Sequence, residues 1–161
     1  MEKNSHLRNI DCYNFNLSIS KIVLNVFNKY IQDDELSPES GGIVTGKIYD
    51  DLIEILNCSE PSDLDTSSRY NFNRSFKTAQ NFINERFEMS NGEEVYLGEW
   101  HTHPEDIPTP SKTDINSFTK TIKKNRLNSK VHFMIIIGRV SIYIGVYFNN
   151  KFKQKIMVDI M

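Results

Sequence analysis

One stretch of the chain carries its most informative residues: Gly98-Glu99-Trp100-His101-Thr102-His103-Pro104, followed after six residues by Ser111-Lys112-Thr113-Asp114. His101 and His103 are two positions apart, so on an extended strand both imidazoles leave the same face. Asp114 adds a carboxylate eleven positions after His103. A catalytic zinc takes three protein ligands and keeps a fourth position open for water, and imidazole and carboxylate suit it. The stretch therefore predicts a zinc site held by His101, His103 and Asp114.

The same residues resemble the signature of the JAMM (MPN+, JAB) metalloproteases, H-[ST]-H-P-(x)6-S-x-x-D with a Glu far upstream. In that signature the Glu precedes a Gly-rich strand, and here Glu39 precedes Gly41-Gly42. The resemblance runs from about Glu39 to Asp114, and the full set of polar positions is much more specific than a lone H-x-H pair. It implies a zinc-dependent hydrolase of peptide or isopeptide bonds.

Two further residues are candidates for the chemistry. Moving a proton from the attacking water to the leaving amine needs a carboxylate that is not a ligand, and Glu39 is the candidate; alone, it would be an exposed turn acid. Ser111 is placed to donate a hydrogen bond to the oxyanion, although it could simply cap a helix. Glu99 is the alternative proton carrier, or an imidazole partner or substrate contact, because alternation puts it on the histidine face. Glu105 and Asp106 are expected to be surface acids.

The other histidines and the cysteines carry no comparable pattern. His6 and His132 have no ligand-spaced neighbours, and we expect His132 to point outward from its strand. Trp100 should point away from the metal and pack in the core. Cys12 and Cys58 have no histidine pattern nearby, which disfavours a cysteine protease. The two cysteines are 46 residues apart, so they do not form the C-x-x-C pair of zinc deaminases.

Composition predicts a single domain over residues 1–161 that is soluble and cytoplasmic. A hydrophobic fraction of 39% supports a packed core. The net charge of −2 disfavours nucleic acid and membrane surfaces as partners. No signal-peptide pattern follows Met1, no apolar run approaches the ~20 residues of a membrane span, and two cysteines are too few for a disulfide framework. The basic residues of one predicted helix are expected to form a solvated face; they are Lys120, Lys123, Lys124 and Arg126.

Apolar periodicity predicts an α+β domain. Strands are expected at 13–19, 42–49, 52–56, 131–137, 140–148 and 151–160 and in the metal stretch, and helices from Ser20, over 74–89 and from Ser111. Residues 1–12 are either a flexible lead-in or a short edge strand. The polar stretch 57–73 is long for a structureless loop, so it is either functional or mobile. The resemblance implies the MPN (cytidine-deaminase-like) fold, a curved mixed sheet flanked by helices, with 57–73 as an insertion that grips the substrate.

The resemblance also implies a substrate class. JAMM enzymes cleave after the C-terminus of ubiquitin or ubiquitin-like proteins, and the Gly-Glu-Trp-His-Thr-His-Pro run is most similar to small isopeptidases of CBASS antiphage systems. The implied substrate is a protein whose extended C-terminal tail is joined to a target, a conjugated cGAS/DncV-like nucleotidyltransferase. The alternatives are a deconjugase or processing protease for another bacterial ubiquitin-like or sulfur-carrier protein, and an inactive MPN scaffold. A scaffold is disfavoured because such proteins lose ligands and this chain has all of them.

Overall fold

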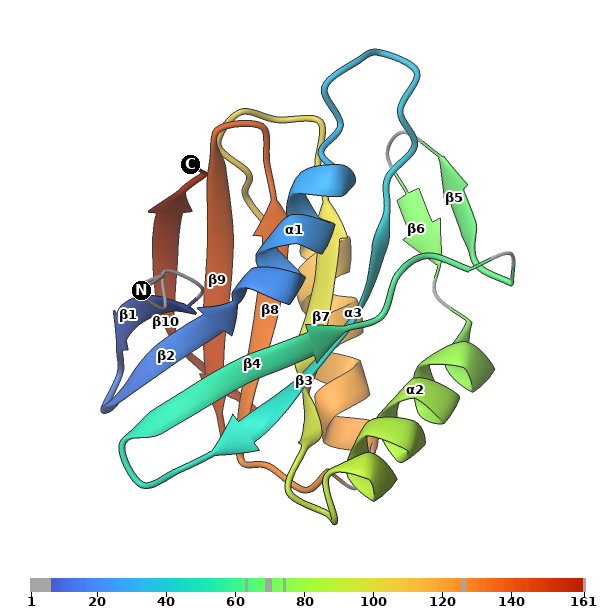
Figure 1. The fold of residues 1–161 in the computed structure, drawn as a ribbon. Coiled ribbons are helices and arrows are strands. Elements are labelled where there is room, and N and C mark those ends of the chain that lie inside the picture. Colours follow the sequence, from blue (N-terminus) through green and yellow to red (C-terminus); the bar gives the residue numbers. More distant parts are fainter. Residues whose placement is uncertain (1–6, 63, 69–70, 74, 126, 161) are drawn as a thin grey trace, which may run out of the picture.

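The computed structural model describes residues 7–62, 64–68, 71–73, 75–125 and 127–160 (Figure 1). One eight-stranded sheet organises these residues, in the order β1-β2-β4-β3-β7-β8-β9-β10. The pairs β2–β4 and β7–β8 are parallel and the other neighbours are antiparallel, so the sheet is mixed, as expected. Its strands are β1 (Leu7–Cys12), β2 (Phe15–Ser20), β3 (Gly41–Ile48), β4 (Leu52–Cys58), β7 (Val95–Thr102), β8 (Val131–Ile137), β9 (Ser141–Phe148) and β10 (Lys151–Asp159).

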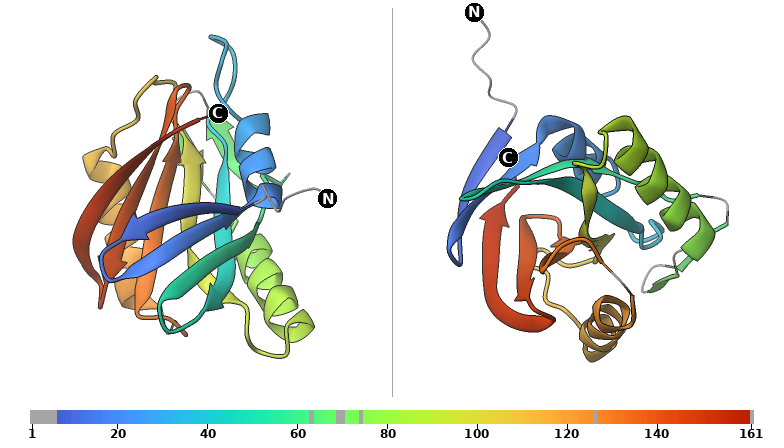
Figure 2. Two further views of the ribbon diagram at one scale, coloured as in Figure 1. Left: turned by 60° about the vertical axis from the view of Figure 1, so that its left-hand side comes forward. Right: turned by 90° about the horizontal axis from the view of Figure 1, so that it is seen from below.

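The sheet is strongly curved (Figure 2). Its curvature brings the turn between β1 and β2 back to the opposite end of the sheet, where the Tyr13 N–H donates to Gln154 Oε1 at 2.8 Å. The ring of Tyr13 lies 6.4 Å from that of Phe148. A curved sheet flanked by helices was expected from the family resemblance, and the described residues confirm this coarse architecture.

Three helices cover the sheet, namely α1 (Lys21–Lys29), α2 (Phe76–Met89) and α3 (Lys112–Lys124). Each begins after a serine whose hydroxyl accepts a backbone N–H of the first turn, which satisfies a donor that the helix itself leaves unpaired. The three capping pairs are Ser20 with Val23, Ser75 with Thr78 and Ser111 with Asp114. None of the described helices combines the length and apolar character needed to cross a bilayer.

The core occupies both faces of the sheet. One face packs against α1, where the rings of Phe27 and Trp100 are 5.3 Å apart. The other face packs against α3 through Phe118 and Ile122. Figure 2 shows α1 and α3 on opposite sides of the sheet. β8 is buried along its whole length because its alternate side chains enter these two clusters.

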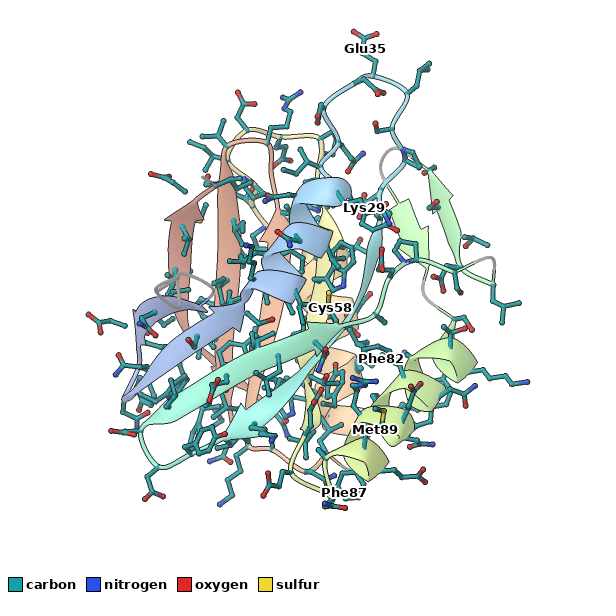
Figure 3. All side chains as sticks on the ribbon, viewed as in Figure 1. Lys29, Glu35, Cys58, Phe82, Phe87 and Met89 are labelled. Carbon is teal, nitrogen blue, oxygen red and sulfur yellow. The ribbon has the colours of Figure 1, made fainter. Side chains whose placement is uncertain are left out.

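α2 packs beside α3 on the same face of the sheet. Ala79 and Phe82 lie against Ile43 of β3 and Tyr96 of β7. Phe82 is labelled in Figure 3. Leu127 contacts both this cluster and the α3 cluster, which joins the two helices over one surface. This face is also the one that carries the predicted metal ligands, because Ile43 is paired with Glu99, two residues before His101.

Two expectations need correction or refinement. Of the two alternatives for residues 1–12, residues 7–12 form the edge strand β1, and residues 1–6 lie outside the described residues. The polar stretch 57–73 is not a structureless loop. It continues β4 as far as Cys58 and then contains a small hairpin, β5 (Thr66–Ser68) and β6 (Asn71–Asn73). The sequence did not predict this hairpin because its short, mostly polar strands lack the alternation of apolar and polar residues that marks a strand.

Gly98 lets β7 fit between its neighbours. Its φ of +147° is one that side-chain-bearing residues rarely adopt, and a Cβ there would collide with the backbone carbonyl of Phe133 in β8. The register between β3 and β7 shifts at the same level, between Val44 and Thr45, which is the signature of a bulge. The glycine therefore sets the course of the strand that leads to His101.

Candidate metal centre

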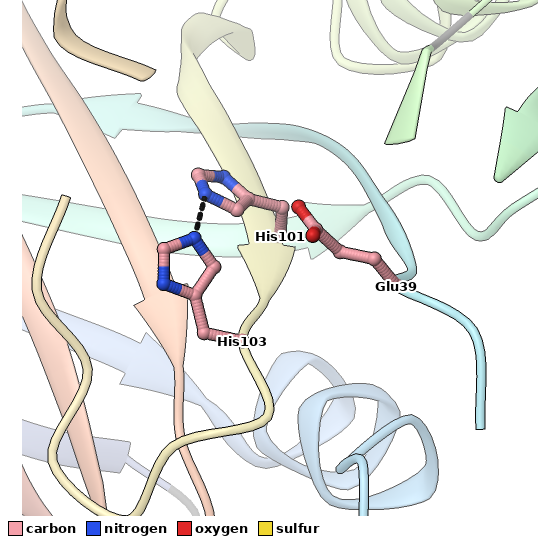
Figure 4. A group of neighbouring side chains, drawn as sticks. All are labelled: Glu39, His101 and His103. Atoms are coloured by element: carbon pink, nitrogen blue, oxygen red, sulfur yellow. Dashed lines mark hydrogen bonds between the residues drawn. The ribbon is translucent and has the colours of Figure 1, made fainter. Parts of the chain in front are cut away.

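The two histidines lie at the end of β7, in the middle of the sheet. His101 is paired with Gly41 of β3 on one side and with Ile136 of β8 on the other. His103 follows the last residue of the strand, and its N–H donates to Ile137 O at 3.0 Å, so the backbone stays attached to β8. Both rings point the same way, as predicted, and their Nε2 atoms are 3.1 Å apart (Figure 4).

Asp114 reaches the histidines from the first turn of α3. The Ser111 hydroxyl accepts the Asp114 N–H at 3.0 Å, and Asp114 Oδ2 accepts the Ser111 N–H at 2.8 Å, which is a complete capping box. The same Oδ2 lies 3.4 Å from His101 Nε2 and 3.1 Å from His103 Nε2. The cap thus fixes the carboxylate beside the two imidazoles rather than competing with that arrangement.

These three atoms fit a single divalent cation. They form a triangle with edges of 3.1, 3.1 and 3.4 Å. Three ligands of a tetrahedral zinc, each at about 2.0–2.1 Å from the metal, would be about 3.3–3.4 Å apart. The donor types and the spacing agree with one such ion, and the fourth tetrahedral position of that ion would remain for water or substrate.

Glu39 lies next to this triangle. It precedes β3, its side chain is almost completely buried, and its carboxylate points toward His101 (Figure 4). Its N–H donates to Ser68 O, which attaches the β5–β6 hairpin to this position. Glu39, His101 and His103 form a second possible donor set, whose ligand atoms lie within 4.8 Å of one another. The shorter spacings favour Asp114 as the third ligand and Glu39 as a neighbour.

The electrostatics of the cluster keep Asp114 ionised and favour the protonated forms of His103 and Glu39. Burial alone would raise the pKa of Asp114, but hydrogen bonds from His101 and His103 outweigh it and hold that pKa well below its usual range. Burial opposes the charged form of His103, yet the hydrogen bond and charge of Asp114 raise its pKa. Burial raises the pKa of Glu39 to about 6, against the lowering effect of the two histidines. A carboxyl in that range can exchange protons near neutral pH.

Glu105 was expected to be a surface acid, but it also faces the site. Its Oε1 lies 3.8 Å from His103 Nδ1, although about half of its side chain is exposed. A carboxylate on the far nitrogen of a ligating imidazole would favour the tautomer that leaves Nε2 free. Asp106 fits the expectation, since it is exposed and pairs with Arg139 at 2.9 Å. The contact between Glu105 and His103 had one signal in the sequence, namely that the two residues are only two positions apart.

The other predictions have mixed outcomes. Trp100 points away from the histidines into the core, as predicted, and its Nε1 donates to Ser59 O at 2.9 Å. The prediction for His132 was wrong: it is 2% exposed rather than outward, because β8 is covered on both faces. Glu99 is half-buried in β7, and its role stays a prediction.

A family model described as prokaryotic homologs of the JAB domain matches residues 30–150. The chain belongs to this prokaryotic JAB family. All five predicted site residues, Glu39, His101, His103, Ser111 and Asp114, fall inside the matched part of the JAB domain.

Several relatives of this JAB protein carry the name CD-NTase/cGAS isopeptidase. One from Escherichia coli (strain TW11681) is 37% identical over 145 residues, which cover 90% of both chains. One from Vibrio cholerae is 37% identical and covers 72% of both chains. One from Pseudomonas aeruginosa is 32% identical and covers 80% of both. The fold is also similar to the solution structure of a Desulfitobacterium hafniense protein, with a TM-score of 0.51 and 18% identity over 86% of this chain and 88% of that one.

Proposed function

We propose that this JAB-family protein is a zinc-dependent isopeptidase that cleaves after the C-terminus of a conjugated protein and so separates that protein from its target. The triangle of His101 Nε2, His103 Nε2 and Asp114 Oδ2, with the Glu39 carboxylate beside it, carries the proposal. Hydrolysis at a metal site needs such a set of three ligands together with a carboxylate that is free to move protons.

In this proposal His101, His103 and Asp114 hold the zinc. When bound, zinc would supply Lewis-acid chemistry, since it lowers the pKa of water at its open position and polarises the scissile carbonyl. Glu39 accepts a proton from the attacking water and delivers it to the nitrogen of the leaving amine. Its burial and its pKa of about 6 support this role, because the group can both take and release a proton near neutral pH.

Ser111 would stabilise the oxyanion. Its oxygen accepts the Asp114 N–H at 3.0 Å as the cap of α3. A serine hydroxyl has one donor hydrogen and two acceptor lone pairs, so capping leaves the hydrogen available for a second partner. Ser111 is exposed and caps the helix that carries Asp114, so the carbonyl of a substrate could reach it. The structural role as cap and the proposed catalytic role are therefore compatible.

The substrate that we propose is a conjugated cGAS/DncV-like nucleotidyltransferase of a CBASS antiphage system. Support comes from the relatives at 32–37% identity that carry the isopeptidase name. The reaction would take place in the cytoplasm, where the free thiols of Cys12 and Cys58 would stay reduced. Conjugates of another bacterial ubiquitin-like or sulfur-carrier protein are the competing substrates, and an inactive scaffold is disfavoured because the donor set is complete.

The test uses a fusion of the nucleotidyltransferase tail to a reporter protein, with a ubiquitin-like or sulfur-carrier tail as the competing substrate. We expect the purified protein to contain one zinc and to cleave the first fusion, and we expect a chelator to abolish cleavage. Glu39→Gln should keep zinc and lower turnover by roughly 10²–10⁴-fold. Glu99→Gln is the matched control and should retain turnover.

Each other outcome has a defined meaning. If Glu99→Gln loses activity and Glu39→Gln keeps it, the proton carrier is Glu99. If only the competing fusion is cleaved, the substrate assignment is wrong. Absence of zinc and of cleavage for all fusions would refute the proposed function.

A further inference from the structure

Thr102, the residue between the two histidines, has a hydroxyl that both accepts and donates a hydrogen bond. Its side chain is fully buried on the face opposite to the imidazoles. Its Oγ1 accepts the Ser40 N–H at 2.9 Å and donates to Gln32 Oε1 at 2.9 Å. The Thr102 N–H in turn donates to Ser40 O at 2.9 Å. Ser40, the residue directly after Glu39, is therefore attached to Thr102 through its N–H and its carbonyl.

Gln32 extends this contact to the loop that leads to Glu39. It follows α1, is fully buried, and donates from Nε2 to Ser37 O at 3.0 Å. The segment between α1 and β3 is thereby attached at Ser37 through Gln32 and at Ser40 through Thr102. Glu39 lies between these two attachment points. Its position relative to the histidines is set by a chain of buried hydrogen bonds that starts on the histidine strand itself.

We propose that Thr102 and Gln32 are positioning residues for Glu39. The inference rests on the proposed role of Glu39 as proton carrier, and it identifies what holds that carboxylate in place. A proton carrier has to stay within hydrogen-bond reach of its water, and a displacement of about 1 Å at an active site can cost roughly 10²-fold in rate. Neither residue touches the reacting atoms. Both act through the backbone on either side of Glu39.

The chain offers a matched control for this test. Thr45 is also fully buried, lies in β3, and donates from Oγ1 to Glu94 at 2.6 Å, away from the histidine strand's end. Thr102→Val and Thr45→Val each remove one buried hydroxyl and keep the side-chain shape. We expect Thr102→Val to lower kcat by roughly 10²-fold with KM and zinc content near those of the wild type. Thr45→Val should keep kcat, and Thr102→Ser should restore it.

A second measurement does not depend on activity. Hydrogen exchange of peptides covering residues 38–42 should be faster in Thr102→Val than in Thr45→Val, because only the former frees the Ser40 N–H. If Thr102→Val does not fold, Gln32→Met tests the other attachment, because it removes the bonds to Thr102 and Ser37 while keeping a similar shape. The Ser40 N–H keeps its acceptor in that variant, so faster exchange of residues 38–42 would then report the loosened segment as a whole.

Equal exchange rates in the two valine variants would overturn the positioning role, as would equal losses of kcat. Loss of zinc from Thr102→Val would also overturn it, because the effect would then act through the histidines. A wild-type protein that cleaves no fusion would refute the proposed function instead, and the exchange comparison would still decide the positioning role.

Discussion

Replacing His132 with leucine should remove a pH-dependent instability of the fold. His132 is buried in β8 beside the ring of Tyr96, and burial lowers its pKa to about 4. Within the described part of the chain neither of its ring nitrogens has a hydrogen-bond partner. Leucine is of similar size, so the substitution removes a titrating group without breaking a hydrogen bond found there.

The sign and size of this pH effect on stability follow from the difference between the pKa of His132 in the folded and unfolded states. Above the unfolded pKa of 6.5 both states are neutral at this residue, and it has no effect on stability. As the pH falls below 6.5, the unfolded chain binds a proton that the folded protein excludes, so stability is lost progressively down to a pH of about 4. The full loss is about 3 kcal/mol, of which about 2 kcal/mol is reached by about pH 5.

Urea unfolding of metal-free wild type and His132→Leu at about pH 7.5 and about pH 5 measures this effect. Titrations of the histidines and acids of the metal centre occur in both proteins and cancel in the comparison. The free energy of unfolding of the variant, relative to wild type, should rise by about 2 kcal/mol between the two pH values. A difference that stays constant would refute the conclusion that His132 is kept neutral by burial.

Three further tests, two of them with a control variant, concern other parts of the structure. Gly98→Ala should destabilise the protein by more than about 1 kcal/mol in urea, because it strains the backbone at φ +147° and collides with β8; a wild-type midpoint would show that the strands can relax. Ser111→Ala should cost about 1 kcal/mol of stability and lower turnover by roughly 10²–10³-fold, whereas Ser75→Ala, which removes the cap of α2, should cost similar stability and leave turnover intact. Equal turnover in the two cap variants would exclude Ser111 from the chemistry. His103→Ala should lose zinc by metal analysis while His132→Leu retains it, and unchanged zinc in the first would remove His103 from the ligand set.

The closeness of the candidate ligand side chains was largely predictable because much of their geometry is local. Residues two positions apart on a strand point to the same face, so His101 and His103 are expected to lie together whatever the rest of the fold is. The capping box of Ser111 and Asp114 is likewise a property of four consecutive residues. Only the approach of Glu39 to this cluster required the family resemblance, since β3 and β7 are separated by the whole of β4 to α2.

What could not be predicted depends on contacts between distant segments. Alternation shows which side of β8 carries His132, but not that α2, α3 and their loops cover that side. The bond between Gln32 and Thr102 joins residues 70 positions apart, and neither residue belongs to a recognisable pattern. The short polar hairpin from Thr66 has no apolar periodicity. The cytidine-deaminase-like arrangement implied by the resemblance stays a prediction.

The central claim is that His101, His103 and Asp114 together hold one zinc while Glu39 remains beside it without binding it. Anomalous diffraction at the zinc absorption edge, from crystals grown with zinc, tests this most directly. We expect a single peak about 2.0–2.2 Å from both Nε2 atoms and from Asp114 Oδ2, with the Glu39 carboxylate outside bonding distance. A peak bonded to Glu39 in place of Asp114, or one located away from the two histidines, would contradict it.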